Sequence, residues 1–228
     1  NDYRPVISAD QNTIFFTSRR KNKVKEIFDD GENEEQTYVS NRQEDGTWSE
    51  ATRIDGLFSS KGQVTATCVH DNELYIVRDG DIYISRRDSA NGNWNKATTL
   101  GPTINSSSDE RYAFVSADGS ELYFSSNREG GFGGFDIYHS YRLPNGQWGI
   151  PRNLGSVINT EYDEDSPVMH AEKPVLYFSS NGHNSMGGYD IFFSIKNEND
   201  SAFQAVQNIG YPINTPDDED CIKVYISV

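Results

Sequence analysis

Acidic residues gather at three points of the chain, each a few positions after an Ile-Asn pair. The clusters are Asp109-Glu110, Asp163-Glu164-Asp165 and Asp217-Asp218-Glu219-Asp220, and each precedes an apolar stretch that we expect to be a strand. Such carboxylates can be solvated loop residues, ligands for a hard cation such as calcium, or a catalytic pair of the kind used in glycoside hydrolysis. The sequence favours solvated loops and leaves the other two open. The candidate metal ligands are Asp163, Asp165, Asp218 and Asp220.

The remaining groups offer little reaction chemistry. No nucleophile elbow, Walker loop or Cys-x-x-Cys pair occurs, and the four histidines lack metal-ligand spacing. The glycine-rich run 127–136 leads into an expected strand rather than a helix, so it predicts a tight connection and not a phosphate-binding loop. These features favour a protein that is not an enzyme and holds no cofactor, with calcium as the alternative left open.

The charge balance narrows the choice of partners. The chain has 20 Lys and Arg against 35 Asp and Glu, and this net charge of −15 repels phosphate backbones and anionic lipid. No stretch is apolar over the length that a membrane helix needs. We therefore expect neither nucleic-acid binding nor direct membrane insertion.

A basic run followed by an acidic run interrupts the first part of the chain. Such charge blocks are usually solvated, and the alternative is that the basic residues contact a protein partner. The residues proposed for that contact are Arg19, Arg20, Lys21, Lys23 and Lys25.

A repeat of roughly fifty residues supplies the elements that must position these groups. Asp136 and Asp190 lie 54 positions apart, and Asn105, Asn159 and Asn214 follow one another at steps of 54 and 55. Each repeat contains four short runs rich in Val, Ile, Tyr and Phe, which favour β-strands. Asp-Gly and Asn-Gly pairs between the runs favour hairpin turns.

Four antiparallel strands per repeat are typical of a β-propeller blade, with a β-sandwich or a β-solenoid as the alternative. We expect one all-β propeller domain over 1–228, with blades at 1–55, 56–105, 106–159 and 160–214 and the start of a further blade at 215–228. Because the chain opens on an innermost strand and stops after one, we expect it to belong to a longer polypeptide. Innermost strands line the channel of a propeller, so the acidic clusters should converge near one mouth.

Two more features recur once per repeat. A carboxylate before an Ile-Tyr or Ile-Phe pair is expected to cap turn amides rather than to catalyse, at Asp81, Asp136 and Asp190. An aromatic residue after the hairpin turn is expected to pack between blades rather than to stack on a ligand, at Trp48, Trp94, Trp148 and Phe203.

Blade three carries the sequences by which the chain resembles a known family, and blade four also matches that family closely. They are Leu-Tyr-Phe-Ser-Ser-Asn-Arg at 122–128, Gly-Gly-Phe-Gly-Gly-Phe-Asp-Ile-Tyr at 130–138, and Gly-x-Trp-x-x-Pro-x-Asn-Leu-Gly at 146–155. Together they resemble the WD-like (PD) repeat of TolB-type propellers. The resemblance is in particular to Bacteroidota envelope proteins of the PorE type, which join tetratricopeptide repeats, a propeller and an OmpA-like peptidoglycan-binding domain.

That resemblance implies a periplasmic, outer-membrane-associated protein with protein partners in the cell envelope, possible service to type IX secretion, and peptidoglycan contact only through a domain outside this chain. With no catalytic set apparent, we expect a non-enzymatic protein–protein interaction scaffold. The alternatives are a carbohydrate-active propeller enzyme that uses channel carboxylates, and a calcium-binding propeller module.

Overall fold

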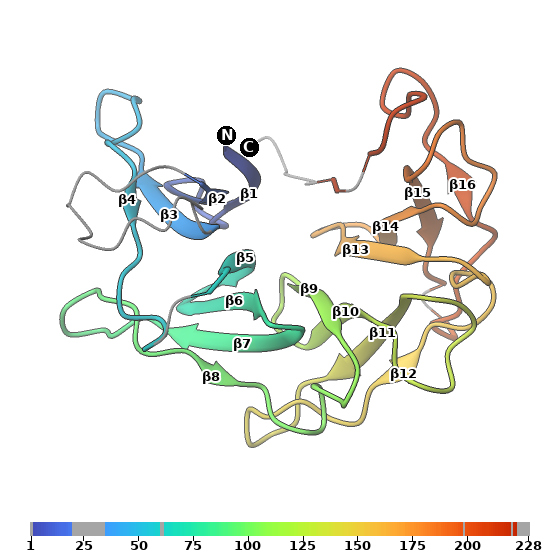
Figure 1. Ribbon diagram of the computed structural model, residues 1–228, viewed down its shortest axis with the longest axis horizontal. Helices are drawn as coiled ribbons and strands as arrows, with labels where there is room; N and C mark the ends of the chain where they lie inside the picture. The colour runs from blue at the N-terminus through green and yellow to red at the C-terminus, as the bar shows by residue number, and fades with distance from the viewer. Residues whose placement is uncertain (1, 20–34, 60–61, 198, 220, 223–228) are drawn as a thin grey trace. The chain divides into compact units, whose positions relative to one another are not determined.

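The computed structural model describes the chain except for residues 1, 20–34, 60–61, 198, 220 and 223–228. The described secondary structure is entirely β and forms four four-stranded antiparallel sheets, labelled strand by strand in Figure 1. The first two sheets contain β1 (Asp2–Ile7), β2 (Thr13–Ser18), β3 (Gln36–Asn41) and β4 (Thr52–Arg53), then β5 (Thr65–His70), β6 (Glu73–Arg78), β7 (Asp81–Arg86) and β8 (Thr98–Thr99). The other two contain β9 (Glu110–Val115), β10 (Glu121–Ser126), β11 (Asp136–Tyr141) and β12 (Arg152–Asn153), then β13 (Glu164–Met169), β14 (Val175–Ser180), β15 (Asp190–Ile195) and β16 (Gln207–Asn208).

Hairpin turns join the third and fourth strands where the sequence has Asp-Gly or Asn-Gly. Gly46 and Gly146 have φ of +82° and +81°, a region that glycine occupies at little cost. At the second of these turns the N–H of Leu143 donates to the carbonyl of Gln147 at 2.7 Å. The turn residues thereby determine the register of each outer strand pair.

A β-bulge divides the first strand of each sheet. The register shifts between Ala66 and Cys68 in β5, and a residue with positive φ lies at the shift in the other three sheets, at Arg4, Tyr112 and Ser166. In β9 and β13 the bulge separates a polar start of the strand from an apolar remainder. Bulges re-aim side chains, and here they isolate the polar ends that form the site described below.

The chain divides into two compact units, each with its own apolar core. Unit 1 comprises Asn1–Asp79 with Tyr83–Thr98, and unit 2 comprises Gly80–Ile82 with Thr99–Val228. In unit 1, β1 packs beside β5 over a core that includes Phe15, Leu74 and Ile76. In unit 2, β9 packs beside β13 over a core that includes Ile137, Leu176 and Phe178.

The prediction of an all-β propeller built from four-stranded antiparallel blades is confirmed. The single-domain boundaries stay a prediction, and the strand expected from Cys221 onward lies largely outside the described residues. Across the described part of the chain, no helix has the length and apolarity that crossing a membrane requires.

Candidate functional site

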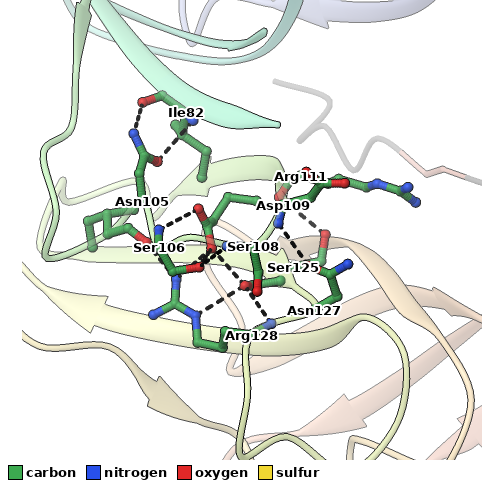
Figure 2. Close-up of polar contacts among 12 residues, drawn as sticks. Ile82, Asn105, Ser106, Ser108, Asp109, Arg111, Ser125, Asn127 and Arg128 are labelled. Atoms are coloured by element: carbon green, nitrogen blue, oxygen red, sulfur yellow. Dashed lines mark hydrogen bonds and ion pairs between the residues drawn. The ribbon is translucent and has the colours of Figure 1, made fainter. Parts of the chain in front are cut away.

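In unit 2 each acidic cluster follows an asparagine whose side-chain amide hydrogen-bonds the N–H and the carbonyl of one residue in the third strand of the preceding sheet. We call this pair of bonds the asparagine clamp. Asn159 is 1% exposed; its Oδ1 accepts the N–H of Ile137 at 2.8 Å and its Nδ2 donates to the carbonyl of Ile137 at 3.0 Å. The same pair of bonds recurs between Asn105 and Ile82, shown in Figure 2, and between Asn214 and Ile191. The clamp attaches the chain to the preceding sheet a few residues before each acidic cluster.

The glutamates that follow are buried. Glu110 and Glu164 are both 0% exposed. The carboxylate of Glu164 accepts the N–H and the hydroxyl of Thr160, each at 2.7 Å, and the hydroxyl of Ser180 at 2.7 Å. Burial raises the pKa of Glu164 despite these donors. The expectation of solvated loop carboxylates is therefore wrong at both positions, because the asparagine clamp folds the preceding loop over the carboxylates.

Glu110 has an additional cationic partner. Nη2 of Arg128, which is labelled in Figure 2, lies 3.0 Å from Oε1 of Glu110, and Nε of Arg128 donates to the hydroxyl of Ser126 at 3.1 Å. The guanidinium also lies over the rings of Phe124 and Tyr138, 5.1 and 4.9 Å from their centroids. Because the Glu110 side chain is fully buried, we interpret this ion pair as a structural contact at the start of β9.

Asp163 and Asp218, which directly precede Glu164 and Glu219, contact the glycine-rich loop of the blade before. Oδ1 of Asp163 accepts the N–H of Phe135 at 2.7 Å, and Oδ1 of Asp218 accepts the N–H of Tyr189 at 2.9 Å. A Cβ on Gly134 or Gly188 would collide with the respective carboxylate. The Gly-Gly loops and the acidic clusters are therefore two halves of one contact.

Asp165 differs from the other acidic residues of its cluster. It is the second residue of β13 and is half-buried. Its Oδ1 accepts the hydroxyl of Ser125, from β10, at 2.5 Å and the N–H of Ser166 at 2.7 Å. Two donors thus orient a carboxylate that remains in contact with solvent.

Tyr189 and Arg111 complete a polar group that we name the Asp165 cluster: Asp163, Asp165, Arg111, Ser125 and Tyr189. The hydroxyl of Tyr189 donates to Oδ2 of Asp163 at 2.9 Å. Burial raises the pKa of Tyr189, and the hydrogen bond to Asp163 and the charges of Asp163 and Asp165 raise it further, while Arg111 opposes them. Arg111 is exposed, and its guanidinium lies 3.7 Å from the centroid of the Phe135 ring. The cluster offers an oriented carboxylate, a protonated phenol and a cation.

The predicted metal ligands are only partly brought together. Asp163 and Asp165 both act on Tyr189, and Asp218 binds the N–H of the same tyrosine. Asp220 lies outside the described residues. Among the described residues, no group of three or more His, Cys, Asp or Glu side chains is arranged to hold a metal ion.

The predicted partner residues fall mostly outside the described part of the chain. Arg19 is described and pairs with Glu35, whereas Arg20, Lys21, Lys23 and Lys25 lie outside the described residues. No partner contact is assigned to this run.

The residues that recur once per repeat lie at the starts of the third strands and after the hairpin turns. Asp136 accepts the N–H of Phe132 at 2.6 Å, and Asp190 accepts Nδ2 of Asn208 at 3.0 Å; Asp81 begins β7. The tryptophans differ from one another: Trp148 is 7% exposed, Trp48 is 43% exposed, and Trp94 is half-buried against Phe15.

Sequence reasoning missed Arg111, Ser125 and Tyr189. Arg111 and Asp165 occupy the same position of β9 and β13, so aligning the repeats pairs a cation with an anion. Tyr189 reaches Asp163 across 26 positions of the chain, and no local pattern signals that approach.

Comparisons with known proteins establish the fold. No family model matches the chain, and no curated protein has a similar sequence. Among solved structures it is similar to the catalytic domain of a Coprinopsis cinerea GH62 α-L-arabinofuranosidase, with a TM-score of 0.58 and 12% identity over 94% of this chain and 70% of that one. It is also similar to a Penicillium chrysogenum α-L-arabinanase, with a TM-score of 0.56 and 12% identity over 94% of this chain and 68% of that one.

A periplasmic gluconolactonase of Pseudomonas aeruginosa is a third neighbour, with a TM-score of 0.53 and 12% identity over 90% of this chain and 56% of that one. The chain thus spans about half the length of this neighbour. At such identities the likeness establishes a propeller fold and nothing finer. All three neighbours are nevertheless named as enzymes, which contradicts the expectation of a non-enzymatic scaffold. That expectation rested on the lack of a catalytic set in the sequence, and side chains that come together from separate repeats leave no local sequence signal.

Proposed function

We propose that this chain is the propeller of a carbohydrate-active enzyme in which Asp165 is the ionised carboxylate of the reaction site. The observation that supports this proposal is the Asp165 cluster, an oriented and accessible carboxylate that lies close to a cation and a phenol. The likeness of the fold to an arabinofuranosidase and an arabinanase raises the weight of saccharides as the substrate class.

The cluster suits hydrolysis of a glycosidic bond. That reaction needs an ionised carboxylate that activates water or stabilises positive charge at the anomeric carbon, together with a second carboxyl group. Asp165 takes the first role because Ser125 and Ser166 hold it in one orientation. We assign Asp163 as the second carboxyl group, because its charge and that of Asp165 both raise the pKa of Tyr189. Arg111 donates to the oxygens of the bound saccharide.

The test is turnover of a panel of arabinan, xylan, glucan and galactan oligosaccharides by the wild type and by Asp165→Asn. Asparagine keeps the Oδ1 acceptor for its two donors but removes the charge, so the fold should persist. We expect kcat to fall by about 100-fold or more. The matched control is Asp200→Asn, an exposed turn residue whose Oδ1 accepts the N–H of Ala202 at 3.0 Å, and it should retain wild-type turnover within about twofold.

Two results would contradict the proposal. One is the absence of turnover of every saccharide by the wild type. The other is an Asp165→Asn variant as active as Asp200→Asn when both have wild-type melting temperatures.

We further propose that the chain belongs to the TolB-type propellers with WD-like repeats and works in the periplasm, on the support of the repeat sequences at 122–128 and 130–138. The flanking sequence of the parent polypeptide tests the family, because a PorE-type protein carries tetratricopeptide repeats and an OmpA-like domain. Fractionation of the source cells tests the compartment.

A further inference from the structure

Unit 1 contains a half-open groove of about 790 Å³ at the end of the sheets opposite Asp2. The β1–β2 turn and the β5–β6 turn form two of its sides, and residues around β4 and the turn before β8 form the others. Trp94 is half-buried and provides its aromatic surface; it packs edge-on against the buried ring of Phe15, with ring centroids 5.7 Å apart and planes at 76°. We name it the Trp94 groove. Its volume is within the range of about 300–1,000 Å³ that small-molecule sites occupy.

The corresponding place between the two blades of unit 2 is closed by an ion pair. Nζ of Lys196 lies 2.8 and 2.9 Å from the two carboxylate oxygens of Glu121, and 3.1 Å from the hydroxyl of Tyr123. These groups bind one another across the blade interface, and Phe203 packs on the apolar core behind them. No ligand is needed to satisfy their polar atoms.

The repeat places different residues at those positions in unit 1. Arg87 corresponds to Lys196, because each opens the bridge to the aromatic residue after the turn. Thr13 and Phe15 take the positions of the glutamate and the tyrosine as the first and third residues of their strand. These two positions therefore offer Arg87 neither an acid nor a phenol, and the contact that Lys196 makes in unit 2 has no equivalent there.

The guanidinium of Arg87 is held in place by a hydrogen bond within its own turn. Its Nε donates to the carbonyl of Gly92 at 2.8 Å, within its own turn. Among the described residues, none forms an ion pair with Arg87, whereas the neighbouring Arg86 is paired with Glu73 at 3.0 Å. An exposed guanidinium anchored at one nitrogen leaves its remaining N–H groups directed at a ligand or at water.

We propose that the Trp94 groove binds a short neutral saccharide. An aromatic side chain offers a flat apolar surface to a sugar ring, and sugar hydroxyls both donate and accept hydrogen bonds. The lining supplies both kinds of partner, with donors at Arg87 and Asn93 and acceptors at Asp10 and Asp71. Arg53, the other cation of the lining, is paired with Asp55 at 2.6 Å.

The charge of the lining favours a neutral ligand over an anionic one. Carboxylates and guanidinium groups both line the groove, and the whole chain carries a net charge of −15. A polyanion would be repelled by that field. This binding site goes beyond the proposed hydrolysis and does not depend on it, since no residue of the Asp165 cluster lines the groove.

The test is calorimetric titration of the full chain with neutral arabino-, xylo-, gluco- and galacto-oligosaccharides, repeated with Trp94→Ala and Arg87→Met. We expect at least one neutral oligosaccharide to bind, and each variant to weaken that binding by about tenfold or more. Arg87 is exposed, so Arg87→Met tests the proposal even if Trp94→Ala disturbs the core beside Phe15. The matched control is Trp48→Ala, which removes the equivalent aromatic residue of the first blade and should leave the affinity unchanged.

The Asp165→Asn variant separates the two sites. Its affinity for the neutral saccharide should equal that of the wild type, whatever its turnover. The proposal is overturned if no neutral saccharide binds, if Arg87→Met binds as the wild type does, or if Asp165→Asn abolishes the binding.

Discussion

We expect Asn159→Ala to destabilise unit 2 more than the truncation of any asparagine that does not form a clamp. The substitution leaves the N–H of Ile137, inside a buried strand, without its acceptor. A buried donor without a partner costs about 1–3 kcal/mol. The two acceptors of Nδ2 keep other donors, since the carbonyl of Ile137 also accepts Leu154 and Oδ1 of Asn153 also accepts Gly155. The loss of the two hydrogen bonds from Nδ2 adds about 1 kcal/mol. We therefore expect the free energy of unfolding to fall by about 2–4 kcal/mol in all.

Urea denaturation followed by circular dichroism measures this loss, and thermal melting should show a decrease of roughly 5–15 °C. The control is Asn145→Ala, because Oδ1 of Asn145 accepts the N–H of Gln147 at 3.0 Å in an exposed turn, where water can replace it. We expect that variant to lose under about 1 kcal/mol. Equal losses in the two variants would refute the reasoning that burial of the amide, and not the count of hydrogen bonds, determines the cost.

Two ion pairs of unit 2 give further predictions. Arg128→Met should cost about 3 kcal/mol in urea denaturation, because it leaves the carboxylate of Glu110 buried without its cation while three other donors remain. The control is Arg152→Met, at an exposed position, which should leave the stability nearly unchanged. Equal losses in the two variants would contradict this prediction. Lys196→Met should cost about 1–3 kcal/mol at pH 7. Burial alone would raise the pKa of Glu121, but the hydrogen bonds from Lys196 and a tyrosine outweigh it and lower the pKa below its ordinary 4.5. The stabilisation is therefore present above pH 4.5 and is lost as the pH falls through the lowered pKa. The difference in unfolding free energy between wild type and Lys196→Met should accordingly shrink below pH 4.5. A difference that grows there would contradict the assignment.

The sequence was sufficient to predict the blades because their signals are local. Alternating apolar residues and the Asn145-Gly146 turn act within a few positions, and the 54-residue spacing of Asp136 and Asp190 repeats them in register. The first-strand bulges escaped prediction, because Tyr112 and Ser166 adopt positive φ only in a strand pair whose register shifts. Nothing in their residue types announces that conformation.

The acidic clusters show most clearly what the sequence determined and what only the tertiary structure decided. Sequence alone determined that a carboxylate stands at 163, at 164 and at 165 before the first strand of a blade. Only the tertiary structure decided that Glu164 is buried under its own loop, that Asp163 binds the loop of the blade before, and that Asp165 remains accessible. The physical reason is that burial and hydrogen bonding depend on partners 16 to 40 positions away, namely Ser180, Phe135 and Ser125, which come close only when the strands pair and the sheets pack.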